Sequence, residues 1–130
     1  SLEGGIGKAA ALKIAYAAWT KGSSALILAV RAMARNTGVE EDLLYEWSLS
    51  QPNAEALTLL SATLNSPKAW RFVSEMDEIS KTFTANGVPN SFWDAAAEVY
   101  DRLKDFKNLP HDQVNVDSVI QKLIETNEDI

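Results

Sequence analysis

The sequence predicts an all-α fold in which about six helices surround one long N-terminal helix, and three observations support this prediction. Residues 6–35 contain no proline, one glycine beyond the first turn at Gly22, and many alanines and leucines, the best helix formers. In the later segments, apolar residues recur at helical spacing, and proline, glycine and asparagine separate one segment from the next. No stretch alternates apolar and polar residues for long enough to form a strand.

Length and composition limit the class of protein. A chain of 130 residues with 46% hydrophobic residues can form one domain with a real core, residues 1–130. A formal net charge of −6 repels phosphate backbones, so we expect no nucleic-acid partner. The chain has no cysteine and a single histidine, His111, which excludes thiolate metal sites and any site that needs two histidines. We therefore expect no metal.

The N-terminal residues show no targeting signal. The longest uncharged apolar run, residues 22–30, is far shorter than the roughly 20 residues that cross a bilayer. The first five residues are small and polar and do not resemble a signal peptide. We expect a cytoplasmic protein without a membrane partner. Because the chain does not begin with methionine, we also expect a fragment or a processed product.

The long first helix, about thirty residues, would extend roughly 45 Å at 1.5 Å per residue. Its apolar residues do not form one narrow stripe, so the helix is apolar nearly all round. Such a helix is expected to be buried nearly all round, here by other helices or by a second subunit. Gly38 follows it at the position where glycine commonly ends a helix.

The later helices are predicted from their start and stop signals. Acidic residues begin the second helix and suit its positive end. Leu57, Leu60 and Leu64 recur at helical spacing in the third helix, and Ser66-Pro67 precedes the fourth as a cap and first turn. The fifth helix, capped by Asn90 or Ser91, is expected to turn Phe92, Ala96, Val99, Leu103 and Phe106 inward. The ranges are 40–50, 54–64, 68–85, 90–106 and 116–126, with a loop at 108–115 around Pro110 and His111.

Lys13 is the strongest candidate for chemistry. It lies among alanines and other apolar residues, and a lysine removed from water there would give up its proton more readily. The alternative, which spacing alone favours, is that its stem lies along the helix and its ammonium reaches water. Tyr16 lies one turn later, where its hydroxyl either hydrogen-bonds a substrate or only packs. Gly4, Gly5 and Gly7 lack the strand and fingerprint of a dinucleotide site, so they indicate a hinge or domain boundary.

The other polar candidates each have an ordinary interpretation. Arg71, beside Trp70, could clamp a carboxylate or phosphate, but an ion pair with Glu75 one turn later is favoured. The four tryptophans are more typical of residues that anchor a core or an interface than of a cofactor-binding motif.

Two stretches carry a family resemblance. Residues 7–17, GKAAALKIAYA, match the first glycine and the lysine of G-x-G-x-x-x-K-x-x-x-N, and GVP at 87–89 precedes AAAEVY at 95–100. These stretches resemble the C-terminal helical domain of the β-hydroxyacid dehydrogenases, the 6-phosphogluconate and 3-hydroxyisobutyrate dehydrogenase superfamily. The resemblance is closer still to one subgroup of this superfamily, the phosphogluconate-dehydrogenase-like proteins with the DUF1932 domain. It lies in the stretches ALKIAYAAWTKGS and KAWRFVSEMDEI. The resemblance covers residues 5–106; residues 107–130 have no counterpart.

The resemblance implies roles for particular residues. The family lysine, Lys13 here, exchanges a proton with the substrate hydroxyl while a hydride passes to nicotinamide. The second glycine of the motif is Ala9, and the substrate-binding asparagine is Ala17, for which Tyr16 is a candidate substitute. The lysine that reaches the cofactor aligns near Ser74, so that contact is absent. Trp70 and Arg71 are the candidates for binding a substrate specific to the subgroup.

The resemblance also implies partners. NAD or NADP is bound by an N-terminal Rossmann domain, which this chain lacks, so we expect no oxidoreductase activity from it alone. The expected substrate is a small hydroxyacid, and the helical domain is expected to build a homodimer. Loss of the asparagine and the second glycine leaves an alternative, a non-catalytic helical dimerisation or interaction module. A third reading, a bundle that binds a small ligand, rests only on the tryptophans.

Overall fold

A computed structural model describes residues 5–124 and confirms the all-α prediction, because this part of the chain contains helices and turns but no strand. The six α-helices are α1 Gly5–Asn36, α2 Glu40–Ser50, α3 Ala54–Leu60, α4 Ala69–Ala85, α5 Ser91–Arg102 and α6 Val116–Ile124. The predicted end of the sixth helix, residues 125 and 126, lies outside the described residues.

Short turns of other helical types connect these elements. The third predicted helix ends as a π-turn, Ser61–Asn65, and the 3-10 turn Ser66–Lys68 with Pro67 leads into α4. The segment between α5 and α6 contains two further 3-10 turns, Lys104–Phe106 and His111–Gln113. The predicted helix over residues 90–106 is therefore an α-helix followed by a 3-10 turn.

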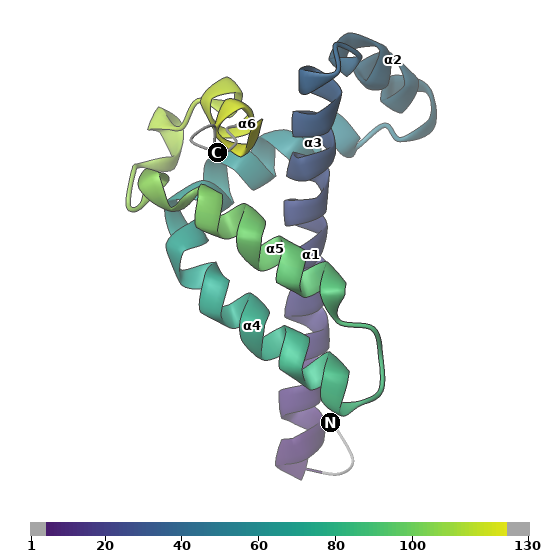
Figure 1. Ribbon diagram of the computed structural model, residues 1–130, viewed down its shortest axis with the longest axis vertical. Coiled ribbons are helices and arrows are strands. Elements are labelled where there is room, and N and C mark those ends of the chain that lie inside the picture. Colours follow the sequence, from purple (N-terminus) through teal and green to yellow (C-terminus); the bar gives the residue numbers. More distant parts are fainter. Residues whose placement is uncertain (1–4, 125–130) are drawn as a thin grey trace, which may run out of the picture.

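Helix α1 runs the whole length of the molecule (Figure 1). The α4–α5 hairpin lies obliquely across one side of α1, and α6 lies near its C-terminal end. Helices α2 and α3 lie at the same end on another side, and α2 stands away from the rest of the chain. Consistent with that position, α2 contains no fully buried residue.

The core lies where α1 meets α4, α5 and α6. Trp93 fixes α5 against α1, because its Nε1 donates a hydrogen bond to the Ala18 carbonyl at 3.0 Å. Gly22 leaves room for that ring, since a Cβ at Gly22 would lie 3.0 Å from Trp93 Nε1. The largest fully buried hydrophobic side chains are Leu28, Met76, Ile79, Tyr100, Leu103, Val119 and Ile120.

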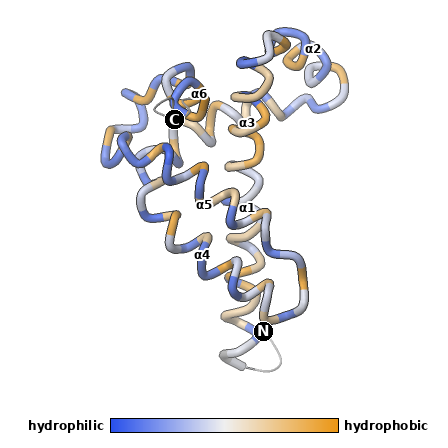
Figure 2. Tube along the Cα trace, viewed as in Figure 1, coloured by the Kyte–Doolittle hydropathy of each residue, from blue (hydrophilic) through white to orange (hydrophobic). Residues whose placement is uncertain are grey.

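The prediction that other helices of the chain bury α1 nearly all round is wrong, whereas cover by a second subunit stays a prediction. Residues 7–13 are exposed, and Trp19 retains 75% of its surface. The reason is that the hairpin, α6 and α3 contact only part of the surface of α1, so that Leu12, Tyr16 and Leu26 also remain more than half exposed. Figure 2 shows the apolar colouring continuing along α1 beyond the covered part.

The buried residues of α5 and α3 also differ from those that the sequence pattern suggested. Phe92 was expected to point inward but is 73% exposed, because the neighbouring Trp93 takes the inward position and stacks on Phe83 with ring centroids 3.8 Å apart. In the third helix, Leu57 and Leu60 remain exposed, and Thr58 is the buried residue.

Candidate functional site

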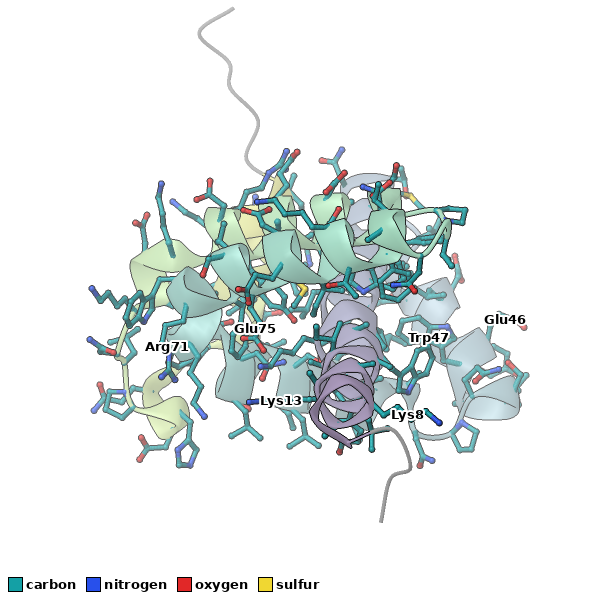
Figure 3. All side chains as sticks on the ribbon, turned by 90° about the horizontal axis from the view of Figure 1, so that it is seen from below. Lys8, Lys13, Glu46, Trp47, Arg71 and Glu75 are labelled. Atoms are coloured by element: carbon teal, nitrogen blue, oxygen red, sulfur yellow. The ribbon has the colours of Figure 1, made fainter. Side chains whose placement is uncertain are left out.

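Lys13 lies on the exposed N-terminal part of α1. Figure 3 shows it pointing to the side of α1 on which Glu75 and Arg71 of α4 lie, whereas Lys8 points to the opposite side. Within residues 5–124, no carboxylate forms an ion pair with Lys13. The ammonium therefore reaches water in this chain, which is the alternative that its spacing favours.

Tyr16 and Ala17 follow Lys13 but face different surroundings. Tyr16 is 71% exposed, and the described residues give its hydroxyl no hydrogen-bond partner. Ala17 is half-buried and packs against the core. Because successive helix residues are about 100° apart around the axis, the two side chains diverge. A molecule bound at Lys13 would meet the Ala17 methyl at the edge of the core and the Tyr16 ring on the solvent side.

A polar cluster that the sequence did not reveal lies farther along α1. Lys21 forms an ion pair with Glu75, and its Nζ lies 4.5 Å from the centroid of the Phe72 ring. The hydroxyl of Tyr100 donates to the Lys21 carbonyl at 2.5 Å, and burial raises the pKa of Tyr100. Lys21 is about 12 Å from Lys13 along the helix axis. The cluster therefore joins α1, α4 and α5 on the side of Lys13.

This cluster corrects one prediction. Glu75 does not pair with Arg71, as its spacing suggested, because it turns toward α1 and Lys21. The signal that could have found it is the position of Glu75 between the apolar residues Phe72 and Met76, at the edge of the buried stripe. The choice of Lys21 as its partner depends on tertiary packing.

Trp70 and Arg71 lie together at the start of α4. The Arg71 Cζ is 5.8 Å from the centroid of the Trp70 ring, and Lys107 Nζ is 4.2 Å from it. Trp70 is 40% exposed, so the indole and both cations can meet solvent. Lys107, from the tail that the resemblance did not cover, is the additional member of this group. Neither Arg71 nor Lys13 lines the two cavities described next.

A groove of about 940 Å³ runs between α1, α2 and α3. Its floor holds a hydrogen bond of 3.1 Å between the buried hydroxyls of Ser24 and Ser61. A second cavity of about 420 Å³, almost wholly apolar, lies between α1 and α5 around Gly22. Trp19, Ser23 and Leu26 line both cavities, so they form a ridge between them. The groove is otherwise lined mainly by Ile27, Val30, Trp47, Ala54, Leu57, Leu60 and Leu64.

An arginine–carboxylate network anchors α2 and α6 to the end of α1. Glu40 accepts hydrogen bonds from Arg31 Nη2 and Arg35 Nε, both at 2.9 Å. Arg35 Nη2 also donates to Asp117 at 2.7 Å. Hydrogen bonding to Arg35 and then to Arg31 lowers the pKa of the Glu40 carboxyl. Since these charges satisfy one another, the network holds helices together rather than presenting a reactive group.

Residues 5–124 offer neither a cluster of metal ligands nor a membrane-spanning helix. No group of three or more histidine, cysteine, aspartate or glutamate side chains in this part of the chain could hold a metal ion. His111 is exposed in a 3-10 turn. No described helix has both the length and the apolar character needed to cross a membrane.

Comparison with known proteins gives one match. The model of a family described as a domain of unknown function, DUF1932, matches residues 34–103. Trp70 and Arg71 lie inside the matched range, whereas Lys13, Tyr16 and Ala17 precede it. No curated protein and no solved structure matches the chain.

Proposed function

Because the chain belongs to the DUF1932 family, we propose that it is the substrate-binding and dimerisation domain of an NAD(P)-dependent hydroxyacid dehydrogenase-like oxidoreductase. The observation that carries the proposal is Lys13, which stands in register with the lysine of the motif the chain resembles. Its ammonium is exposed on α1 and has no ion-pair partner among residues 5–124. A neighbouring domain can therefore approach it directly.

The dinucleotide does not fit the described residues by themselves. A Rossmann site needs a strand, a glycine-rich turn and a helix N-terminus, and residues 5–124 contain no strand. In this proposal the cofactor is held by a nucleotide-binding domain that docks beside α1. NAD or NADP bound there would accept or supply the hydride. The present chain contributes proton transfer and substrate contacts.

Lys13 is the proposed proton-transfer residue. Docking of the nucleotide-binding domain would remove water from its ammonium, which favours the neutral amine. The amine can then take the proton of the substrate hydroxyl as a hydride leaves the neighbouring carbon, and return it in the reverse direction. Ala17 offers no hydrogen bond where the family motif has asparagine, so the exposed Tyr16 hydroxyl is the proposed substitute.

Trp70 and Arg71 are proposed to bind the acidic part of the substrate. A small hydroxyacid carries a carboxylate, which the fork of a guanidinium matches well. The Arg71 guanidinium lies near the Trp70 ring and has no carboxylate partner among the described residues, so it remains available. These two residues lie within the range that the family model matches.

The test is steady-state kinetics with the chain joined to, or mixed with, its Rossmann domain. Lys13→Ala is expected to lower kcat for hydroxyacid oxidation by about 10²–10⁴-fold, the contribution typical of general acid–base catalysis. Lys8→Ala is the matched control, since Lys8 is also exposed on α1 but points to the other side. An unchanged kcat for Lys13→Ala would show that Lys13 is not catalytic.

The uncovered apolar face of α1 supports a second candidate, a non-catalytic helical module that binds a partner. In that case Lys13→Ala would have no effect on any turnover, whereas substitutions in the groove would abolish partner binding. The two candidates therefore give different results with the same set of variants.

A further inference from the structure

The groove between α1, α2 and α3 is polar at one end and mainly apolar at the other. Along α1, its polar lining residues come first and its larger apolar ones follow. The polar end is lined by Thr20, Lys21, Ser24, Ser61 and Asn65, and the other end by Ile27, Val30, Trp47, Ala54 and Leu57. The volume of about 940 Å³ lies in the upper part of the range of small-molecule sites, about 300–1,000 Å³.

Two buried hydroxyls at the polar end leave one hydrogen unused. Ser61 and Ser24 retain 2% and 6% of their surface, and their Oγ atoms lie 3.1 Å apart. Two hydroxyls carry two hydrogens, and the bond between them uses one. Within residues 5–124, neither hydroxyl is bonded to another acceptor. The pair can therefore donate one hydrogen bond to a molecule in the groove, and leaving that hydrogen unpaired is costly.

Asn65 supplies an acceptor at the same end of the groove. Its amide N–H donates to the hydroxyl oxygen of Tyr100, because the hydrogen of that hydroxyl is used in the bond to the Lys21 carbonyl. The amide oxygen of Asn65 accepts no hydrogen bond from the described residues. A molecule that reaches the Ser24–Ser61 pair can thus also donate a hydrogen bond to Asn65.

The backbone that presents these groups has an unusual form. Ser61 and Asn65 are the first and last residues of the π-turn Ser61–Asn65, and both line the groove. Turns of this type are rare and are frequently found at functional sites.

The groove offers no net charge to a ligand. Lys21 is the one charged side chain among the described residues that line it, and Glu75 neutralises Lys21 in an ion pair. An ionised molecule would lose its hydration in the groove without gaining a charged partner of its own. The groove therefore favours an uncharged molecule.

We propose that this groove binds an uncharged alcohol with an apolar body, whose hydroxyl accepts a hydrogen bond from the Ser24–Ser61 pair and donates one to Asn65. A hydroxyl is suited to both bonds because it is a donor and an acceptor. From Ser24 to Val30, α1 extends about 9 Å at 1.5 Å per residue, which sets the length of the apolar body. The body would cover Leu57, which is 38% exposed, and this burial stabilises the complex.

This site goes beyond the proposed function and uses other residues. Lys13, Tyr16 and Arg71 do not line the groove, so an alcohol bound there leaves them open to substrate. Alcohol binding can therefore fail while Lys13 remains catalytic, and the reverse result is equally possible.

An NMR titration of the chain with n-octanol, whose extended chain has about the required length, tests the site. We expect one saturable site that shifts the indole N–H of Trp47, whereas the indole N–H of Trp93, which lines the other cavity, stays unchanged. An equal shift at Trp93, or no saturable shift at Trp47, would overturn the proposal. A Trp47 shift that appears on concentrating the chain without n-octanol would identify a second copy as the occupant and would also overturn it.

Two alanines of α3 give a matched pair of variants. Ala54 lines the groove, whereas Ala56 is exposed and does not line it. Ala54→Phe is expected to fill the apolar end and weaken n-octanol binding about tenfold or more, while Ala56→Phe leaves it unchanged. Circular dichroism establishes that both variants are folded. Equal affinities of the two folded variants would contradict the proposed place of the ligand.

The polar end is tested separately. Ser24→Ala and Ser61→Ala together remove both hydroxyls and leave no unpaired partner, so the fold should lose little stability. Loss of one hydrogen bond to the ligand should weaken n-octanol binding about three- to tenfold. Octanoate, which has a carboxylate in place of the hydroxyl, should bind the unsubstituted chain about tenfold or more weakly than n-octanol. An unchanged affinity in the double variant, or octanoate binding as tight as that of n-octanol, would overturn the proposal.

Discussion

The two ends of α1 have similar composition but different surroundings. Near the C-terminal end, Ala25, Leu28 and Ala32 are buried, and Arg31 is tied to Glu40. Near the N-terminal end, residues 7–13 are exposed. The difference teaches that one alanine-rich helix can form the core of a domain over part of its length and leave apolar residues exposed over the rest. The variants below use residues at both ends to test this division.

The largest effect is expected from matched leucine truncations on α1. Leu28 is fully buried, so Leu28→Ala should lower the free energy of unfolding by about 2–5 kcal/mol. Leu12 is 57% exposed, so Leu12→Ala should change the stability of the monomer by less than about 0.5 kcal/mol. Urea denaturation at submicromolar concentration measures both. Equal losses would mean that the two ends of α1 are equally covered.

A second test concerns the glycine at which α1 meets α5. Gly22→Val would push a branched side chain against the Trp93 ring, whose Nε1 would lie 3.0 Å from even a Cβ. We expect a loss of about 1–3 kcal/mol, measured as a shift in the urea midpoint. Gly7→Ala, with no heavy atom within 4 Å of the added Cβ, is the control and should stabilise the helix slightly. If Gly22→Val is as stable as its control, the Trp93 contact is not maintained in solution.

A third test removes the carboxylate that joins the C-terminal end of α1 to α2. Its lowered pKa means that Glu40 contributes stability above its usual pKa near 4.5, and the contribution disappears as the pH falls through the lower pKa of the folded state. Glu40→Gln should cost about 1–3 kcal/mol at pH 7 and less at a pH below 4.5, where the contribution of the charged carboxyl declines as the pH falls through its folded-state pKa. Unfolding curves at both pH values measure this; a loss independent of pH would contradict the role of the charge.

The smallest effect on stability is expected for the Tyr16 hydroxyl. Tyr16→Phe should leave the free energy of unfolding unchanged within about 0.5 kcal/mol, because the hydroxyl has no hydrogen-bond partner among residues 5–124. In the assembled enzyme, the same change should raise KM for the hydroxyacid about three- to tenfold if Tyr16 replaces the missing asparagine. An unchanged KM would show that the Tyr16 hydroxyl does not bind the substrate.

The sequence predicted the helices well because their boundaries carry local signals. Gly38 follows the end of α1, with a φ of 81°, and the structure places Pro67 in the first turn before α4. It was harder to predict which residues of each helix face the core. Phe92 and Trp93 are adjacent aromatics, and only the space left by Gly22 decides which of them turns inward. Exposed alanines cannot be told from buried ones, because alanine forms helix equally well in either place.

The candidate site was predicted less completely. The Lys21–Glu75 pair joins residues 54 positions apart, which no local pattern reveals. Likewise, Lys107 meets Trp70 only through the fold. The position of Lys13 on an exposed surface agrees with the spacing of its neighbours, whereas its proposed role depends on a second domain. Which apolar residues of α1 remain exposed depends on where the hairpin and α6 pack against the helix, and no local pattern in the sequence reveals this.

Chemical labelling at several protein concentrations tests most directly whether α1 has a buried part that forms the core and an exposed part that does not. Hydroxyl-radical footprinting would follow Leu12 and Trp19, while acetylation would follow Lys13. If the proposed dimer forms through the exposed apolar face of α1, we predict that Leu12 and Trp19 become protected as the protein concentration rises through the dimer Kd, whereas Lys13 remains as reactive as in the monomer. Protection of Lys13 together with Leu12 and Trp19, or no protection of these two apolar residues at any concentration, would contradict this account.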